Sequence, residues 1–333
     1  MVAVSTTETW DAAWTLTMRS KRKRMTDNIS DNYPLLGRLR KSGVLETETG
    51  GKEYQEDLMY ALGQSEWFDG YDVLATDAMD GITAAFYTPR YSATPLVISM
   101  TEEMESRKAS GSEKLLTAKT TQAMTGSFDT INAAALSAQS GKSMLGLQDI
   151  CAQSSGTTLG GINSATNTWW ENGRLDFATG TYTSFVTKTD DRYNGVTRMG
   201  TLWNSISEGN DKPNLIVTSY ALYSAYEDIF EGTGYTRMVT NNGKRSGPNH
   251  GIGAEGDIAF RGAPVIPDRD CAADDLYMLN TKYLKLKMQA GLNFAKTPFK
   301  EPSNQMAKVA FVVVGLQLVT NHRARQGVMF DAA

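Results

Sequence analysis

Apolar and polar residues alternate over part of residues 50–99, a stretch that has no evident partner within its own length. The alternating apolar residues are Tyr54, Leu58, Tyr60 and Leu62. This is the period of a half-buried β-strand. The chain returns through residues 82–99, which are rich in β-branched and aromatic residues but contain Pro89 and Pro95. Because proline cannot donate a ladder hydrogen bond, this second limb is predicted to be an edge strand or a bent strand.

The connection between the two limbs is about twenty residues long, far longer than a tight hairpin turn. It contains Trp67, Phe68, Gly70 and Tyr71. A two-stranded ribbon is only marginally stable in water when nothing packs against it. A long ribbon with aromatic residues at its tip therefore predicts a surface on which it lies, and another chain can provide that surface.

A three- and four-residue spacing of apolar residues predicts a long amphipathic helix over residues 111–138. The repeating positions are Leu115, Ala118, Met124, Phe128, Ile131 and Ala135. Without a break, this helix would be about 40 Å long. Shorter helices are predicted over residues 195–207 and 219–230, with a buried strand over residues 214–218 between them.

The C-terminal part of the chain is predicted to be rich in strands. The segments are residues 260–267, 276–279, 284–288 and 309–320. The last is the strongest strand pattern in the chain, and we expect it to be buried on both faces at first and to alternate later. Residues 145–198 are predicted to be rich in loops, and residues 240–257 form a long glycine-rich loop of the kind that is often functional.

The N-terminal residues predict a short amphipathic helix. Ser5 and Glu8 form a capping box, and Trp10, Trp14 and Met18 follow at helical spacing. Five basic residues come next within six positions, namely Arg19, Lys21, Arg22, Lys23 and Arg24. Such a run is either a solvated face or a binding segment.

Charge separates this arm from the ribbon, although the 333-residue chain has a net charge of only -4. Residues 19–41 carry eight basic and two acidic residues, whereas residues 52–81 carry eight acidic residues and one lysine. Opposite charges can bring two surfaces into register, but each exposed pair contributes only about 0–1 kcal/mol. The acidic overall balance argues against a protein whose whole surface binds nucleic acid.

Composition is ordinary for a globular protein, with 41% hydrophobic and 21% charged residues. No signal peptide is evident, and the longest apolar run is about ten residues, roughly half of a membrane span. The two cysteines, Cys151 and Cys271, are far apart and form no metal or redox motif. We therefore expect a soluble chain made in a reducing cytoplasm.

No catalytic constellation is evident in the sequence. There are only two histidines, and neither HExxH nor GxSxG occurs. Residues 140–143 resemble the end of a phosphate loop, but Leu136 stands where that motif needs glycine. Acidic residues cluster at Glu102, Glu103 and Glu105, at Asp190 and Asp191, and at Asp268, Asp270, Asp274 and Asp275. We interpret them as helix-terminal and loop charges, and predict no enzyme activity, cofactor or metal site.

The order of these parts resembles the major capsid proteins of tailed bacteriophages with the Hong Kong 97 fold. Five segments carry the resemblance: PLVIS-x-x-E at 95–102, LIVTSYALYSAYED at 215–228, FRGAPVIPDRD at 260–270, LYMLNTKYLKL at 276–286 and LQLVTNHRARQGVM at 316–329. The resemblance covers nearly the whole chain, but it consists of order and hydrophobicity and contains no catalytic signature.

The resemblance implies an α+β fold with an N-terminal arm at 1–42 and an extended loop, the β-ribbon, at 43–98. A peripheral domain with a long spine helix would comprise 99–145 and 277–333, and an axial domain would comprise 146–276. It further implies hexamers and pentamers that form an icosahedral virion capsid around double-stranded DNA, assembled in the bacterial host cytoplasm. The implied partners are a separate scaffold, a portal, decoration proteins and DNA held by non-specific contacts, with no membrane.

From the ribbon, the arm and this resemblance together, we expect the ribbon to lie across the spine-helix region of a neighbouring subunit. The predicted interface residues are Trp67, Phe68, Tyr71, Glu56 and Asp57 on the ribbon, and Trp10, Trp14, Arg19, Arg22, Lys23 and Arg24 on the arm. Two alternatives stay open: an encapsulin-like cellular shell that holds enzymes, and a carboxylate-based hydrolase with an all-β insert.

Overall fold

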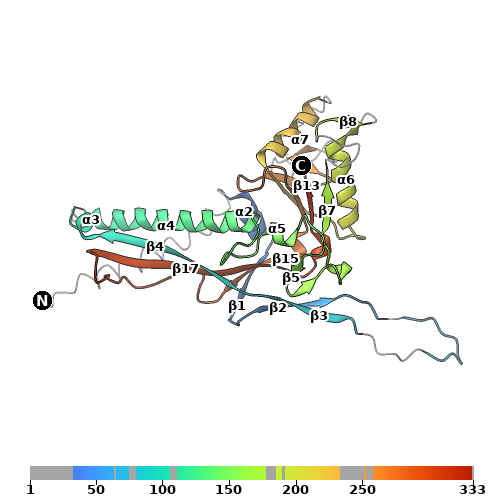
Figure 1. Cartoon of the computed structure of the whole chain (residues 1–333), viewed down its shortest axis with the longest axis horizontal. Helices are drawn as coiled ribbons and strands as arrows, with labels where there is room; N and C mark the ends of the chain where they lie inside the picture. The colour runs from blue at the N-terminus through green and yellow to red at the C-terminus, as the bar shows by residue number, and fades with distance from the viewer. Residues whose placement is uncertain are drawn as a thin grey trace, which may run out of the picture.

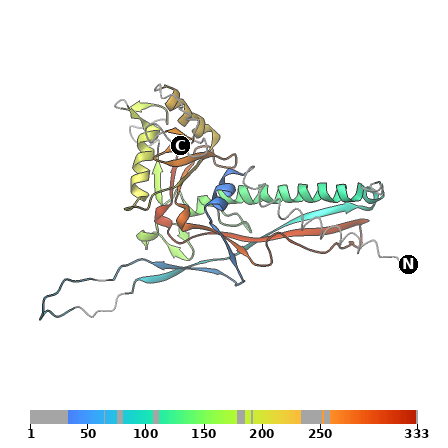
Figure 2. The ribbon, with the colours of Figure 1, turned by 180° about the vertical axis from the view of Figure 1, so that it is seen from behind.

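The computed structural model describes residues 33–63, 65–74, 80–105, 111–177, 185–189, 192–232, 251–252 and 258–331. The described chain has three parts, which Figures 1 and 2 show from opposite sides. A long body contains the longest helix and the longest strands. A second lobe stands on one end of this body, and a thin ribbon projects from the same end, away from α3 (Met100–Glu105) at the other end.

The body is built on a five-stranded sheet. Its strands are β1 (Leu45–Glu48), β4 (Arg90–Ser99), β15 (Leu284–Gln289), β16 (Ala295–Lys296) and β17 (Ala307–Thr320). β17 is central, with β4 antiparallel along one edge and both β16 and β15 along the other. β4 pairs only with β17 among the described strands, so Pro95 lies in an edge strand, as predicted. Pro89 falls between β4 and the preceding strand, which bends the second limb.

The predicted long helix is confirmed as α4 (Gly111–Leu136), which lies along one face of β4 and β17 (Figures 1 and 2). Its buried residues include Leu116, Met124, Phe128 and Ile131, whereas Ala118, which the pattern also placed on the apolar face, is exposed. The short helix α3 (Met100–Glu105) connects β4 to this region.

The end of the predicted arm belongs to the body. Helix α2 (Pro34–Lys41) begins with proline, which suits the first turn because its missing N–H would have no helical acceptor there. Leu35 and Leu39 of α2 are buried in the core of the body, and the Tyr33 ring lies 6.5 Å from that of Phe128. The predicted boundary at residue 42 therefore cuts off a helix that is buried in the main core and lies against β13 (Ala263–Pro267).

The burial predicted for β17 was wrong, because the strand was expected to be buried on both faces at first and to alternate later. The first half alternates between buried and partly exposed residues, and the second half is buried throughout. The first half has α4 on one face only, which leaves the opposite face in water. The second half lies among other elements: the Tyr87 hydroxyl donates to the Thr320 carbonyl at 2.8 Å, and the Leu145 amide donates to Gln317 Oε1 at 3.1 Å.

The second lobe contains a seven-stranded sheet. In spatial order its strands are β11 (Gly251–Ile252), β12 (Ile258–Phe260), β13 (Ala263–Pro267), β10 (Leu215–Thr218), β14 (Leu276–Leu279), β18 (Gly327–Phe330) and β7 (Gly173–Asp176). Leu215 and Val217 of β10 join the core of the body, whereas Ile216 joins the core under the helices α6 (Asn194–Ile206) and α7 (Tyr220–Gly232). Both faces of the central strands are thus covered, which explains their continuous apolar runs.

The remaining short elements connect these layers. They are α5 (Leu147–Ile150), β5 (Thr158–Leu159), β6 (Ile162–Asn163), η1 (Thr168–Trp170), β8 (Lys188–Thr189), β9 (Arg192–Tyr193), η2 (Thr281–Tyr283) and η3 (Arg323–Arg325). Three strands fall on the other side of the predicted domain division. β1 and nearly all of β4 lie within 43–98 but belong to the sheet of the body, and β18 lies within 277–333 but belongs to the second sheet. The predicted loop at 240–257 lies outside the described residues except for β11.

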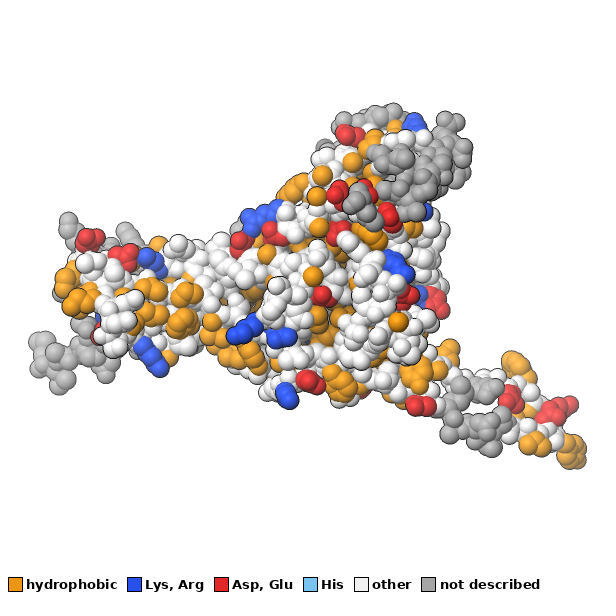
Figure 3. All heavy atoms as spheres, viewed as in Figure 1, with side chains coloured by type: hydrophobic (Ala, Val, Ile, Leu, Met, Phe, Trp, Pro, Cys, Tyr) orange, Lys and Arg blue, Asp and Glu red, His pale blue; other side chains and the backbone are white. Residues whose placement is uncertain are grey.

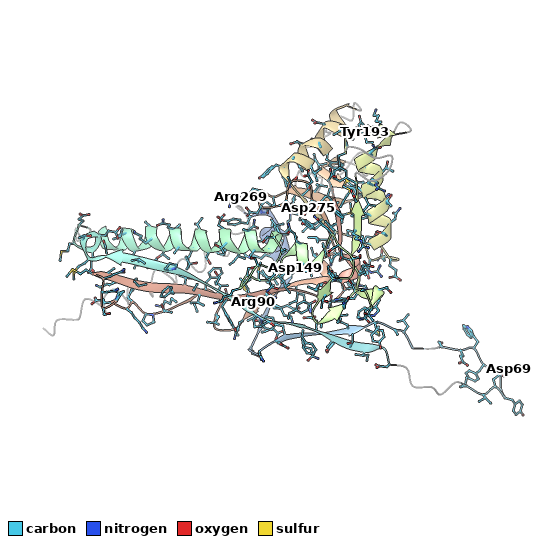
Figure 4. The ribbon with its side chains drawn as sticks, viewed as in Figure 1. Asp69, Arg90, Asp149, Tyr193, Arg269 and Asp275 are labelled. Carbon is cyan, nitrogen blue, oxygen red and sulfur yellow. The ribbon has the colours of Figure 1, made fainter. Side chains whose placement is uncertain are left out.

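A buried carboxylate lies where the body and the second lobe meet. Asp275, labelled in Figure 4, accepts hydrogen bonds from Gln153 Nε2 at 2.7 Å and from the Tyr277 hydroxyl at 2.5 Å. Burial raises the pKa of the Asp275 carboxyl, and these hydrogen bonds only partly oppose that shift. Both cysteines are free and buried, and burial raises the pKa of the Cys151 thiol to about 12, which makes it unreactive.

The raised pKa of Asp275 predicts how stability depends on pH. The folded chain holds this proton more tightly than the unfolded chain, so the stabilisation is complete below the ordinary pKa of 3.8 and is lost as pH rises through the folded value. Asp275→Asn removes the titration and keeps an acceptor for Tyr277. We expect the free energy of unfolding to fall less steeply above pH 3.8 for this variant than for the wild type. The difference between the two falls should total about 1.4 kcal/mol for each unit by which folding raises the pKa of Asp275.

Urea titrations of the purified chain between mildly acidic and neutral pH test this expectation. Glu301→Gln, at an exposed position, is the matched control and should leave the slope unchanged. Parallel curves for Asp275→Asn and the wild type would contradict the assignment.

Candidate assembly interface

The ribbon consists of β2 (Tyr54–Met59), β3 (Ile82–Tyr87) and the residues between them. The strands are antiparallel, with Tyr54 opposite Tyr87 and Met59 opposite Ile82. The alternation predicted from the sequence is confirmed for β2, where every second residue is buried. One face of the ribbon therefore lies against the chain's own body and the other faces water.

The base of the ribbon is attached to the body at several points. The Tyr87 hydroxyl donates to a carbonyl of β17, and the Phe86 amide donates to the Gly160 carbonyl at 3.0 Å. Gly160 has φ +61°, and a Cβ there would come within 2.8 Å of Ala85, so only glycine allows this close approach. The rings of Tyr60 and Trp169 stack with their centroids 5.3 Å apart.

A buried ion cluster joins the ribbon to β1 and β15. Glu56 accepts from Lys287 Nζ at 2.5 Å and from Lys285 Nζ at 3.3 Å, while Lys287 also contacts Glu48 at 2.8 Å. The side chains of Glu56 and Lys287 are 7% and 5% exposed. Burial alone would lower the pKa of Lys287, but its hydrogen bonds to Glu48 and Glu56 outweigh burial and raise that pKa. Lys287 therefore stays charged at neutral pH.

This cluster corrects one predicted interface residue. Glu56 was expected to face the basic arm of another subunit, but it lies on the buried face of β2, with its partners in the same chain. Asp57, the next residue, lies on the outward face and accepts a hydrogen bond from Gln55 at 2.7 Å. Asp57 is therefore exposed, as a residue that contacts another copy would have to be.

The aromatic residues at the tip are fully exposed in the isolated chain. Trp67 and Tyr71 have relative exposures of 104% each, and Phe68 has 67%. A turn holds the tip: the Asp72 amide donates to the Asp69 carbonyl, and the Asp69 amide donates to the Asp72 carboxylate, both at 2.8 Å. Figure 4 shows Asp69 at the end of the ribbon, far from the body. Large aromatic side chains presented in this way are the type that dominates protein interfaces.

Sequence analysis missed the apolar residues on the outward face of the ribbon. Met59 and Ile82 face each other across the strands and are 71% and 73% exposed, and Phe86 is 47% exposed. The signal was present, because these residues alternate with the buried ones in each strand.

A second exposed apolar surface was also missed. On β4 and β17 the side chains that point away from α4 include Val97 and Phe311, which are 44% and 42% exposed. Met100, Met104 and Met306 lie at the same end of the body, where the Met100 amide donates to the Met306 carbonyl. We call these five residues the distal face. Figure 3 shows hydrophobic side chains gathered at this end and again along the ribbon.

The predicted arm residues Trp10, Trp14, Arg19, Arg22, Lys23 and Arg24 lie outside the described residues, so their predicted role stays a prediction. Asp190 and Asp191 also lie outside them. The other acidic clusters include residues bonded within the fold, such as Glu103, which accepts from Lys308 Nζ at 2.9 Å. Across the described residues, no group of acidic, histidine or cysteine side chains is arranged to hold a metal ion. None of the described helices is long and apolar enough to span a membrane.

Comparisons with known proteins identify the fold. No protein-family model and no curated protein matches the sequence. Among solved structures, the capsid asymmetric unit of cyanophage A-1(L) matches with 17% identity and a TM-score of 0.64, over 90% of this chain and 93% of that chain. The capsid of a native GTA particle matches with 12% identity and a TM-score of 0.56, over 89% and 90%.

A further match is an encapsulin, the holo-SrpI complex from Synechococcus elongatus PCC 7942, with 10% identity and a TM-score of 0.54, over 88% of this chain and 86% of that chain. Each of these matches extends over nearly the whole length of both of the chains compared. The chain therefore has the α+β Hong Kong 97 fold, as predicted from the order of its elements.

The ion cluster at the base of the ribbon makes a quantitative prediction. Glu56→Ala leaves Lys287 buried with one carboxylate fewer, and we expect it to lower the free energy of unfolding by about 3–5 kcal/mol. Asp57→Ala changes the neighbouring outward residue and should cost less than about 0.5 kcal/mol. Denaturant unfolding of the unassembled subunits measures both.

A double variant distinguishes the loss of stability caused by a buried, unpaired charge from the loss caused by a general packing defect. Glu56→Leu combined with Lys287→Met removes both members of the pair and should recover most of the stability. Equal losses for Glu56→Ala and Asp57→Ala would show that the cluster does not hold the ribbon.

Proposed function

We propose that this chain is the major capsid protein of a tailed bacteriophage, a structural protein that assembles into hexamers and pentamers of an icosahedral shell around double-stranded DNA. The observation that carries the proposal is the ribbon. A chain with the Hong Kong 97 fold extends two strands away from its body and exposes Trp67, Phe68 and Tyr71 at their tip. An isolated subunit has no use for such an element, whereas a shell provides a neighbour for every tip.

The mechanism that we propose is exchange of the ribbon between copies. The base of the ribbon is fixed to its own body, and the tip lies across the spine-helix region of the neighbouring subunit, meaning α4 and the sheet beneath it. Burial of large aromatic side chains would supply most of the binding free energy. The basic segment at residues 19–24 of another copy would lie against the acidic residues of the ribbon, Asp57 among them, and would set the register.

The predicted division into arm, extended loop, peripheral domain and axial domain belongs to this proposal, with β1, β4 and β18 reassigned as described above. So do the partners: a scaffold, a portal and decoration proteins, with packaged DNA held by non-specific contacts. Assembly would take place in the cytoplasm of the bacterial host. We assign no catalytic residue to the chain.

An encapsulin-like shell is the second candidate, because the holo-SrpI encapsulin complex is among the structures that this fold matches. The two functions differ in what the particle encloses. Purified particles that contain nucleic acid support the capsid, whereas particles that contain a protein cargo support the cellular shell.

The tip residues give a direct test of the assembly mechanism. We expect the double variant Trp67→Ala/Phe68→Ala to fold normally and to fail to assemble, because truncation of a desolvated aromatic anchor commonly costs about 2 kcal/mol or more. Circular dichroism checks the fold, and electron microscopy with sedimentation measures assembly. Trp67→Phe/Phe68→Tyr keeps the aromatic surface and should still form shells. Normal shells from the alanine variant would remove the tip from the mechanism.

The proposed pairing of the basic arm with the acidic ribbon can be tested through the rate of assembly. Salt screens exposed charges over about 10 Å at 0.1 M ionic strength, so the rate of assembly of the purified subunit should fall as salt is added. Light scattering at increasing salt concentration follows this rate. The variant Arg22→Gln/Lys23→Gln should assemble more slowly and depend less on salt. A wild-type rate that salt does not change would rule out pairing between the arm and the ribbon.

A further inference from the structure

One turn of the second lobe contacts the long helix of the body through buried polar side chains. The turn is residues 268–270, directly after β13. Asn132 of α4 is 1% exposed, and its Nδ2 donates to Asp268 Oδ1 at 3.1 Å and to Asp270 Oδ2 at 2.7 Å. Figure 4 shows Arg269 of the same turn beside α4, at the foot of the second lobe. These hydrogen bonds therefore join the second lobe to the body.

Two oxygen atoms at this contact are buried and have no hydrogen-bond partner. They are Asp268 Oδ2 and Asn132 Oδ1. Asp268, like Asn132, is 1% exposed. Buried polar atoms are rarely left without a partner, so each exception calls for an explanation. A carboxylate oxygen and an amide oxygen are both acceptors, which means that they can bond to each other only with a donor hydrogen between them.

A single proton on Asp268 would supply that hydrogen. A protonated carboxyl group has one O–H donor and keeps its other oxygen as an acceptor. Oδ2–H would then donate to Asn132 Oδ1, while Asp268 Oδ1 continues to accept from Asn132 Nδ2. The two side chains would form a reciprocal acid–amide pair, and both of the unpartnered oxygens would be satisfied.

The charges of the turn and of α4 favour the neutral form of Asp268. Asp270 carries a like charge, which disfavours ionisation of its neighbour. Arg269 is the cation of the turn, but its side chain pairs with Asp129 of α4 and with Asp270. Within the part of the chain that the structure describes, no cation pairs with Asp268. Its negative charge would therefore stay buried without compensation.

The other groups near Asp268 do not change this balance. Burial raises the pKa of the Cys271 thiol, which stays neutral. The first turn of α2 has no charged side chain, and the basic residues of this helix are in its last turn: Arg38, Arg40 and Lys41. The backbone amide of Leu35, in that first turn, lowers the pKa of Asp268, but burial has the larger effect and raises it. The start of α2 thus meets the same carboxyl group as α4.

We propose that Asp268 and Asn132 form a proton-binding site that fastens the turn after β13 to α4 and to the start of α2. With the proton bound, the two side chains bond to each other reciprocally. Without it, two carboxylate charges share one amide donor and the buried oxygens lack partners, which weakens the contact. The inference goes beyond the proposed function, because the site would bind its proton whether or not the chain forms a shell.

Acid therefore tightens this junction. The folded chain holds the proton of Asp268 more tightly than the unfolded chain, so the stabilisation is complete below the ordinary pKa of 3.8 and is lost as pH rises through the folded value. Each unit by which closing of the junction raises this pKa changes the equilibrium for local opening by up to about tenfold. Opening should become more frequent as pH rises from mildly acidic to neutral.

Hydrogen exchange of the purified chain, followed by mass spectrometry, measures this opening. After correction for the intrinsic effect of pH, the amides of α2 and of residues 129–136 should exchange faster at neutral than at mildly acidic pH. Asp268→Asn supplies an N–H donor in place of the proton and should lose most of this increase, although Asp275 still titrates. Asp274→Asn, at an exposed position of the same loop, is the matched control and should behave as the wild type. Equal increases in the wild type and Asp268→Asn would overturn the inference.

Infrared spectroscopy detects the proton itself. The difference spectrum between the wild type and Asp268→Asn at mildly acidic pH should contain a carboxylic-acid band that disappears as pH rises. A spectrum that shows only ionised carboxylate at mildly acidic pH would overturn the inference.

A second variant separates the proton from the acceptor. Asp268→Ala removes both, so the same amides should exchange faster than in the wild type at every pH, with circular dichroism as the check that the chain is folded. Exchange in Asp268→Ala as slow as in Asp268→Asn would show that the acid–amide pair does not hold the junction, and would likewise overturn the inference.

Discussion

The attachment of the ribbon base to the body is the constraint on which the rest of the molecule depends. A two-stranded ribbon that moved freely would fold its aromatic tip back onto its own chain, because apolar surface avoids water. Tyr87, Gly160 and the buried pair of Glu56 with Lys287 hold the strands so that the tip stays away from the body. The cost of burying two charges is offset by their mutual attraction and by the second carboxylate from Glu48. As a result, the ribbon points in a single direction, away from the body.

The strand β17 connects this anchor to the other end of the molecule. Its last residues accept the hydrogen bond from Tyr87, and its first residues pair with β4 at the distal face. A single strand of 14 residues therefore spans both the base of the ribbon and the distal face. The pairing of β17 with β4 near its start and with β15 near its end therefore sets the spacing between these two surfaces.

Much of this architecture could be predicted from the sequence because periodicity reports burial directly. The spacing of Met124, Phe128 and Ile131 predicted α4, and Pro95 predicted an edge strand. The role of Glu56 could have been predicted as well. It shares the parity of Tyr54 and Leu58, so the same alternation places its carboxylate on the buried face. The sum of charges over a window hid this, because a sum does not distinguish the two faces of a strand.

Other features depend on contacts between distant parts of the chain, which local patterns do not contain. The burial of β17 follows from which neighbours cover each half, and those neighbours are up to 233 residues away in sequence. The distal face was invisible for the same reason. Val97 and Phe311 look like ordinary strand residues until it is known that α4 covers only the other side. An exposed apolar row on a sheet is indistinguishable in sequence from a buried one.

The acidic residues of the tip would suit the proposed capsid protein, which has to stay soluble before it assembles. Trp67, Phe68 and Tyr71 are exposed on an extended segment, which is a hazard for aggregation at high protein concentration. Glu66, Asp69 and Asp72 are interspersed with them, and like charges keep two tips apart. Charge on the ribbon thus disfavours contact between identical tips and leaves contact with a different surface open, which is the distinction that would separate the proposed ordered shell from an aggregate.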